Sequence, residues 1–243
     1  MNIDIKKYKD DIVFLPLGGT DQIGVNFYLF GYKGKWLIVD FGLGFAHEDL
    51  PGVEIVVPDI SFLESVKKDV LGLVVTHAHE DHIGAIQYLW PEIGVPIFAT
   101  PFTSAVLKTK LTDTGIIEDV TIHEMEINES FGIGPFDLEL VSLTHSIPEM
   151  HGLLIKTEKG SVFHTADWKI DHNPIIGEPF NKAKLKAIGD AGVIAMVCDS
   201  SNIFSENISG SEGDLRKSLH DIVASVQKGL VVVTTFASNV ARL

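Results

Sequence analysis

Cysteine is almost absent from this chain of 243 residues, which has only Cys198. A single cysteine excludes an internal disulfide and fits a reducing compartment. Its neighbours in VIAMVCD are apolar, so we expect Cys198 to be buried in a core. The N-terminus MNIDIKKYKD lacks the apolar stretch of a signal peptide, and no run approaches the roughly 18 apolar residues of a membrane span. These absences predict a cytoplasmic protein.

Positive charge is also scarce, with 19 Lys and Arg against 33 Asp and Glu and a net charge of −14. This balance argues against a general nucleic-acid-binding surface, because phosphate contacts need Lys and Arg. It leaves room for a local cationic cleft, since bound metal ions add charge that the sequence count omits. The hydrophobic content of 45% is that of a globular protein, and the length suits one full core or a domain and a half.

Strand-like runs rich in Val, Ile, Leu and Phe dominate the chain and predict a mostly β core. They span residues 12–17, 26–32, 35–40, 71–76, 95–100, 120–125, 136–144, 152–157, 161–166, 193–199 and 230–235. Helical patterns cover residues 83–90, 101–111 and 212–228, the last with Ser211 as its expected N-cap. Many strands with few helices favour stacked mixed sheets with helices outside.

The C-terminal stretch GLVVVTTFASNVARL predicts a strand, a turn and the first residues of a helix, and then the sequence stops. Few native domains finish on a helix that has just begun. We therefore expect a fragment of a longer chain, and a short native terminus or a disordered tail is the alternative.

The most informative stretch is VVTHAHEDHIGA, in which His77, His79, Asp81 and His82 form the pattern H-x-H-x-D-H. In an extended segment His77 and His79 project to the same side, and after a turn Asp81 and His82 approach from another direction. Imidazole and carboxylate are ligands for zinc, manganese or iron. Crowded ionisable groups at the end of a buried strand need such neutralisation. Four ligands can serve one crowded ion or two adjacent ions; a merely solvated loop would not explain three histidines in six residues.

Three further polar residues follow apolar strands. His145 ends the run VSLT, Asp167 follows VFHTA, and Asp40 ends KWLIV. Strand ends from one sheet converge on one edge, where loops build sites. A single residue of this kind is usually a turn or cap residue, but three of them beside the histidine motif indicate one shared site.

The ordered set Asp40, His77 to His82, His145 and Asp167 resembles the motifs of the metallo-β-lactamase superfamily. The resemblance covers about residues 10 to 200. It implies an α/β (α+β) fold, a four-layered αββα sandwich with a two-metal site on one edge. It also implies these roles: His77, His79 and His145 hold the first ion, Asp81 and His82 the second, Asp167 bridges them, and Asp40 orients a ligand histidine.

Other stretches resemble the ribonuclease J family of the β-CASP branch: LPLGGTDQIGVNFYLF, PGVEIVVPDISFL, THSIPEMHGLLIKT and HTADWKID. In VCDSSN, Asp199 matches the acid of the first β-CASP motif. The chain differs from the family at Gln22, where Glu is usual, and at Met150, where a small polar residue is commoner. The resemblance implies a metallo-β-lactamase domain over residues 1–205 and the beginning of an inserted β-CASP domain over 206–243.

The activity implied by this resemblance is hydrolysis of RNA, 5′-to-3′ from a monophosphorylated end and also internally, by a hydroxide that two divalent ions activate. Zinc is the expected metal and manganese the second choice. Asp81 and Asp167 are the expected catalytic residues, and Ser146 either contacts a phosphate oxygen or makes a turn hydrogen bond. His47 has the best chance of substrate contact among the remaining histidines, while partial burial is expected for His151 and His164.

The family's remaining motifs, including a further histidine ligand of the second ion, lie beyond residue 243. We therefore expect this fragment to bind metal and to be inactive alone, and the full-length protein to be a homo-oligomer, a dimer or tetramer. Two alternatives stay open. One is a small-molecule hydrolase of the same fold, a thioesterase or lactonase, which the motifs through Asp167 permit. The other is a non-catalytic RNA-binding or scaffold subunit, which has no physical need for six ligands.

Overall fold

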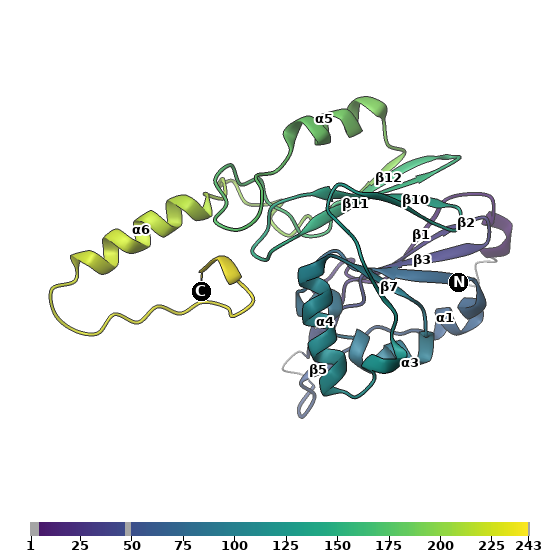
Figure 1. Ribbon diagram of the computed structural model, residues 1–243, viewed down its shortest axis with the longest axis horizontal. Coiled ribbons are helices and arrows are strands. Elements are labelled where there is room, and N and C mark those ends of the chain that lie inside the picture. The colour runs from purple at the N-terminus through teal and green to yellow at the C-terminus, as the bar shows by residue number, and fades with distance from the viewer. Residues whose placement is uncertain (1–4, 47–49, 243) are drawn as a thin grey trace.

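Two mixed sheets stacked face to face form the centre of the computed structural model, which describes residues 5–46 and 50–242 (Figure 1). Within these residues the larger sheet has the order β1-β2-β3-β6-β7-β8, the smaller β13-β12-β11-β10-β9, and β4 pairs with β5. The strands are β1 (Val13–Gly18), β2 (Phe27–Tyr32), β3 (Lys35–Val39), β4 (Gly44–Phe45), β5 (Ile55–Val56), β6 (Val70–Val74), β7 (Ile97–Ala99), β8 (Ile122–Glu124), β9 (Ser130–Ile133), β10 (Phe136–Ser142), β11 (His151–Thr157), β12 (Gly160–His164) and β13 (Ala195–Val197).

Helices cover both outer faces of the stacked sheets (Figure 1). The α-helices are α1 (Ser61–Val66), α2 (Glu80–Ile83), α3 (Ile86–Ile93), α4 (Pro101–Asp113), α5 (Lys182–Ala191) and α6 (Glu212–Ser225). Short 3₁₀ helices span Ile5–Tyr8, Lys67–Asp69, Ile117–Asp119 and Val240–Arg242. Helices α1, α3 and α4 lie on the side of the larger sheet, and α5 lies on the side of the smaller one. The expected αββα layering is confirmed. Among the described residues, no helix is both long and apolar enough to cross a bilayer.

The central strands of the larger sheet are buried on both faces. In β3, Trp36 and Ile38 belong to the cluster beneath the helices, whereas Leu37 and Val39 pack between the sheets. Successive strand residues point to opposite faces, so an apolar residue at every position buries both sides. This is why the run KWLIV is continuous rather than alternating.

The ends of the strands place the candidate ligands at one edge. β3 and β6 are parallel, so Asp40 and the histidine motif emerge side by side. β10 and β12 are both antiparallel to β11, so His145 and Asp167 also emerge in one direction. The convergence expected from the sequence is therefore a consequence of strand direction in both sheets.

Two sequence predictions near the C-terminus are wrong. Residues 230–235 form no strand, because no neighbouring strand among the described residues pairs with their backbone groups. Cys198 is exposed rather than buried, because it follows β13 at the open edge of the smaller sheet. Met196 within β13 is 58% exposed for the same reason.

The predicted helix at the C-terminal end of the chain is confirmed as α6, which extends away from the two sheets (Figure 1). Ser211 caps it by accepting a hydrogen bond from the backbone N–H of Gly213 at 3.1 Å. Its apolar face, including Leu215, Leu219 and Ile222, is 37–59% exposed. The division of the chain at residue 205 stays a prediction.

Candidate metal centre

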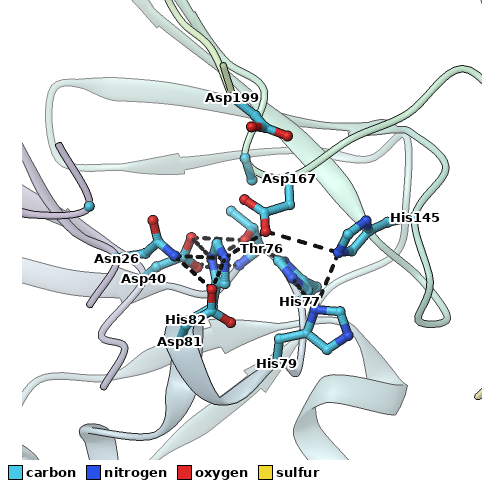
Figure 2. Close-up of polar contacts among 12 residues, drawn as sticks. Asn26, Asp40, Thr76, His77, His79, Asp81, His82, His145, Asp167 and Asp199 are labelled. Carbon is cyan, nitrogen blue, oxygen red and sulfur yellow. Dashed lines mark hydrogen bonds and ion pairs between the residues drawn. The ribbon is translucent and has the colours of Figure 1, made fainter. Parts of the chain in front are cut away.

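Three histidine rings meet at the end of β6 and β10. The Nε2 atom of His77 lies 3.0 Å from Nδ1 of His79, and Nε2 of His145 lies 3.2 Å from the same Nδ1 (Figure 2). The backbone of His79 is extended, with φ −75° and ψ 150°, which places His77 and His79 on the same side as expected. A group of three nitrogens within 4.8 Å of one another suits a divalent ion, because one ion accepts all three lone pairs.

The electrostatics of these three residues, the histidine triad, favour neutral imidazole, which is the metal-binding form. Burial lowers the pKa of His77 well below its ordinary value. Burial also lowers the pKa of His145 to about 4, and the neighbouring His79 adds to this shift. The other nitrogen of His77, Nδ1, contacts the hydroxyl of Thr76 at 3.1 Å. His77 therefore presents Nε2 alone to the centre of the cluster.

A second group, the carboxylate half, consists of His77, His82 and Asp167, again within 4.8 Å of one another. Oδ2 of Asp167 lies 3.4 Å from Nε2 of His82 and 4.0 Å from Nε2 of His145. Asp167 thus stands between the two histidine groups. Oδ2 of Asp81 lies 3.7 Å from Nε2 of His82, so Asp81 lies beside the carboxylate half and not beside the triad.

Charge is distributed unequally in the carboxylate half. Burial alone would lower the pKa of His82, but Asp40 and Asp167 raise it well above the ordinary value. Burial alone would raise the pKa of Asp167, but the adjacent His82 ring lowers it to about 2. The carboxylates of Asp40 and Asp167 therefore favour positive charge at this position.

Asp40 is completely buried and holds two other residues in place. Its Oδ2 accepts a hydrogen bond from Nδ1 of His82 at 2.8 Å, and its Oδ1 accepts one from the backbone N–H of Thr76 at 2.8 Å. This leaves Nε2 of His82 directed at Asp167. Asp40 has a φ of +60°, a conformation that is unfavourable for residues other than glycine. Its contact with a ligand histidine is the one that the resemblance implies.

Asn26 and Tyr28 complete the walls of the site and were not predicted. The Nδ2 group of Asn26 donates to Oδ2 of Asp81 at 3.2 Å and lies 2.9 Å from Nε2 of His82. The Tyr28 hydroxyl donates to Oδ1 of Asn26 at 2.8 Å. The only sequence signal for Asn26 was its position as a single polar residue at the start of the apolar run NFYLF.

Close backbone packing fixes the loop that carries Asp81 and His82. The N–H groups of Asn26 and Phe41 donate to the carbonyls of Asp81 and His82 at 2.9 and 2.7 Å. A Cβ atom on Gly42 would lie 1.6 Å from the carbonyl oxygen of Asp81. Only glycine permits this approach, which explains the glycine in VDFG.

Glu149 anchors the loop that carries His145. Its Oε2 accepts a hydrogen bond from the backbone N–H of Phe102, at the start of α4, at 2.7 Å. Thr100 is the N-cap residue of α4, but its side chain makes no cap bond among the described residues. A carboxylate at a helix N-terminus is also favoured by the helix dipole.

Asp81 belongs to neither group of three, and two other predicted residues also lie outside both groups. Asp199 lines the same cavity of about 760 Å³ as Asp81 and Asp167, but its carboxylate accepts from the backbone N–H of Ser201 at 2.8 Å. Ser146 follows His145 and is partly buried; its hydroxyl makes no hydrogen bond within the described part of the chain.

The remaining histidines differ from expectation in part. His151 and His164 are fully buried instead of partly buried, at 0% and 2% exposure. His151 begins β11 and His164 ends β12, so both lie within the smaller sheet. His220 on α6 is exposed. His47 lies outside the described residues.

The donor set fits the metal that the fold implies. Imidazole nitrogens of the triad face one another, and carboxylate oxygens of Asp81 and Asp167 lie beside the adjoining nitrogens of His82 and His145. Nitrogen and oxygen donors of this kind suit zinc and also accept manganese. The fold and this cluster define a metallo-hydrolase-like sandwich with a histidine-rich centre at the edge of two sheets.

Comparison with known proteins places the chain in a family. Residues 36–194 match the profile described as "Beta-lactamase superfamily domain", and the chain belongs to that superfamily. The resemblance to ribonuclease J is also confirmed. The chain is 42% identical over 238 residues to the ribonuclease J of Sinorhizobium meliloti, covering 96% of this chain and 42% of that protein. It is 34% identical over 242 residues to the ribonuclease J of Thermus thermophilus, covering 97% of this chain and 42% of that protein.

The chain thus spans less than half the length of these two relatives, and it corresponds to their N-terminal portion. Among solved structures, a protein of unknown function from Enterococcus faecalis superposes with a TM-score of 0.67 at 21% identity. The match covers 88% of this chain and 57% of that one. It supports the fold alone.

Proposed function

We propose that this chain carries the metal centre of a ribonuclease of the ribonuclease J type, which hydrolyses RNA phosphodiester bonds. The convergence of His77, His79, His82, His145 and Asp167 is the observation that carries the proposal. The ribonuclease J relatives supply the substrate class. In the whole protein we propose 5′-to-3′ exonuclease and endonuclease action in RNA maturation and decay, in the cytoplasm, by a homo-oligomer that is a dimer or tetramer.

The histidine triad would hold one divalent ion, and Asp81 with His82 would hold a second, with Asp167 between them. Zinc is the proposed metal, and manganese suits the same donors. When bound, such ions supply Lewis acidity toward the phosphoryl oxygens and lower the pKa of water.

The chain's own residues then have distinct tasks. Asp40 fixes the ring of His82 through Nδ1, so that Nε2 remains directed at the reaction centre. Asn26 orients the carboxylate of Asp81, whose side chain is 34% exposed and accessible to water. We assign Asp81 the role of accepting the proton that the attacking water loses, since its carboxylate is accessible to water, is held by Asn26 and lies beside His82. Asp167 is the second proposed catalytic residue, because it lies between both histidine groups.

The direct test uses the 243-residue chain and, as the longer product, the whole protein of which we propose it to be the N-terminal portion. Both are incubated with 5′-monophosphorylated RNA and added Zn²⁺ or Mn²⁺, and in parallel with a generic thioester and a lactone. We expect the longer product to cleave RNA and leave the small esters intact, and this chain alone to bind metal without cleavage. Ester hydrolysis by the longer product with intact RNA would overturn the proposal in favour of the small-molecule hydrolase.

A further inference from the structure

Four charged side chains form a cluster beside the metal centre. Glu212, at the start of α6, accepts from Nζ of Lys169 at 2.7 Å. The same carboxylate accepts from Nε and Nη2 of Arg242 at 3.0 and 2.9 Å. Asp171 accepts from the backbone N–H of Glu212 at 3.0 Å and lies 3.6 Å from Nζ of Lys169. Two cations and two carboxylates thus balance each other.

The two carboxylates of the cluster are buried, whereas Lys169 and Arg242 are 21% and 43% exposed. The side chains of Glu212 and Asp171 are 5% and 0% exposed. The hydrogen-bonded Arg242 guanidinium lowers the pKa of Glu212, and Lys169 adds to that shift. A two-point Arg–carboxylate contact fixes direction as well as distance. Loss of one partner would leave buried charge without compensation.

One side of the cluster is joined to the ligand loops. Lys169 lies two residues beyond Asp167, and its backbone N–H donates to the carbonyl of Thr144 at 2.9 Å. Thr144 directly precedes His145, and its hydroxyl also accepts from the N–H of Asp171 at 3.2 Å. The cluster is therefore built on the two segments that carry His145 and Asp167.

The other side reaches a segment far away in the sequence. Arg242 donates its backbone N–H to the carbonyl of Asn239 at 3.0 Å, which closes a turn. Ser238 directly precedes Asn239, and its carbonyl oxygen lies 3.4 Å from Nε2 of His79. The opposite nitrogen of that ring, Nδ1, is the one that faces His77 and His145.

We propose that Lys169, Glu212 and Arg242 form a clasp that holds residues 236–242 against the metal centre, where the Ser238 carbonyl orients His79. A carbonyl at Nε2 places the ring proton there and leaves the lone pair of Nδ1 free for a ligand bond. Arg242 and Glu212 are positioning residues. The inference rests on the proposed metal centre, and it makes a segment of the C-terminal region part of that centre.

The test compares ¹⁵N-histidine-labelled chains by long-range ¹H–¹⁵N correlation in the absence of metal, followed by titration with Zn²⁺. The variants are Arg242→Ala, Arg242→Lys and Glu212→Gln. The matched control is Asp190→Asn, which breaks an exposed ion pair between Lys186 and Asp190 on α5. The wild-type chain should show His79 with its proton on Nε2.

Arg242→Ala should convert His79 to a mixture of tautomers and weaken Zn²⁺ binding by about tenfold, as loss of an outer-shell partner does. Arg242→Lys and Glu212→Gln should each fall between Arg242→Ala and wild type, while Asp190→Asn should match wild type. Unchanged tautomer and affinity in both Arg242→Ala and Glu212→Gln would overturn the clasp. Failure of the wild-type chain to bind Zn²⁺ would instead count against the proposed function, and the tautomer would still decide the clasp.

Discussion

The histidine triad and the carboxylate half share His77 but differ in how they are prepared for metal. In the triad, burial lowers the pKa of His77 and His145, so the rings are already neutral. In the carboxylate half, Asp40 and Asp167 raise the pKa of His82, so a proton occupies the cationic position. The first half can bind an ion without releasing a proton from these rings, whereas the second must exchange a proton for the ion.

The largest effect should come from the shared residue. His77→Ala removes a nitrogen of the triad that also lies within 4.8 Å of the ligand atoms of His82 and Asp167, so the tightly bound ion should be lost and the second ion should bind more weakly. Elemental analysis after dialysis against Zn²⁺ measures this, with the exposed His220→Ala as control. Retention of the tightly bound ion by His77→Ala would contradict the placing of that ion at the histidine triad.

Asp40→Ala should affect the carboxylate half far more than the triad. It removes the buried acceptor for His82 and Thr76, so we expect a loss of about 3 kcal/mol in the free energy of unfolding of the metal-free chain. The second ion should bind 10- to 100-fold more weakly. Urea denaturation and Co²⁺ titration test both effects. Asp40→Asn keeps one acceptor and tolerates positive φ, so its stability and its affinity for the second ion should lie between those of Asp40→Ala and the wild type. Equal weakening of both ions would contradict the comparison.

Lowering the pH should empty the two halves in a fixed order. His82 has a raised pKa, so protons compete for its Nε2 at higher pH than for the ring of His145, whose pKa is about 4. The second equivalent of metal should therefore be lost first as the pH falls, and the first should persist to lower pH. Metal content measured at each pH decides this. Simultaneous loss of both ions would show that the halves do not differ in protonation.

The same shifts predict how the metal-free chain responds to acid. His145 and His164 have folded pKa values of about 4, below their ordinary value near 6.5. Between those limits the unfolded chain binds more protons, so stability should fall as pH drops from 6.5 toward 4. Denaturation at a series of pH values checks the sign. His164→Gln should flatten this dependence without changing metal content.

The smallest effect is expected at the loop of His145. Glu149→Ala removes the acceptor for Phe102 at the start of α4 and should cost about 1 kcal/mol of stability. Because the loop carries His145, the first ion should also bind severalfold more weakly. Asn181→Ala, which removes a similar cap from α5, should lower stability without changing metal affinity. Equal metal affinity in both variants would limit Glu149 to a structural role.

The sequence was sufficient for the parts of the molecule that depend on local pattern. The continuous apolar run of β3 and the histidines at alternate positions predicted a buried strand followed by a metal motif. The fold class followed from the order of motifs and is confirmed. Asn26 and Ser238 could not be predicted, because their contacts with the site join residues 55 and 159 positions apart.

The errors have a common physical origin at the open side of the molecule. The run LVVVTT has the composition of a strand, yet composition does not supply a neighbour for its hydrogen bonds. Cys198 has apolar neighbours in sequence, but β13 is an edge strand and leaves it exposed. Prediction from local pattern was therefore correct for strands with a neighbouring strand on each side and wrong at the edge of the sheet.

The central claim is that two distinct groups of side chains at one sheet edge hold metal. Its most direct test is the number of zinc ions per chain at pH 7.5 in the wild type, in His145→Ala and in His82→Ala. We predict that the wild type binds one ion tightly and a second more weakly, that His145→Ala loses the tight ion, and that His82→Ala keeps it. Absence of zinc from the wild-type chain, or equal zinc content in all three proteins, would contradict the account.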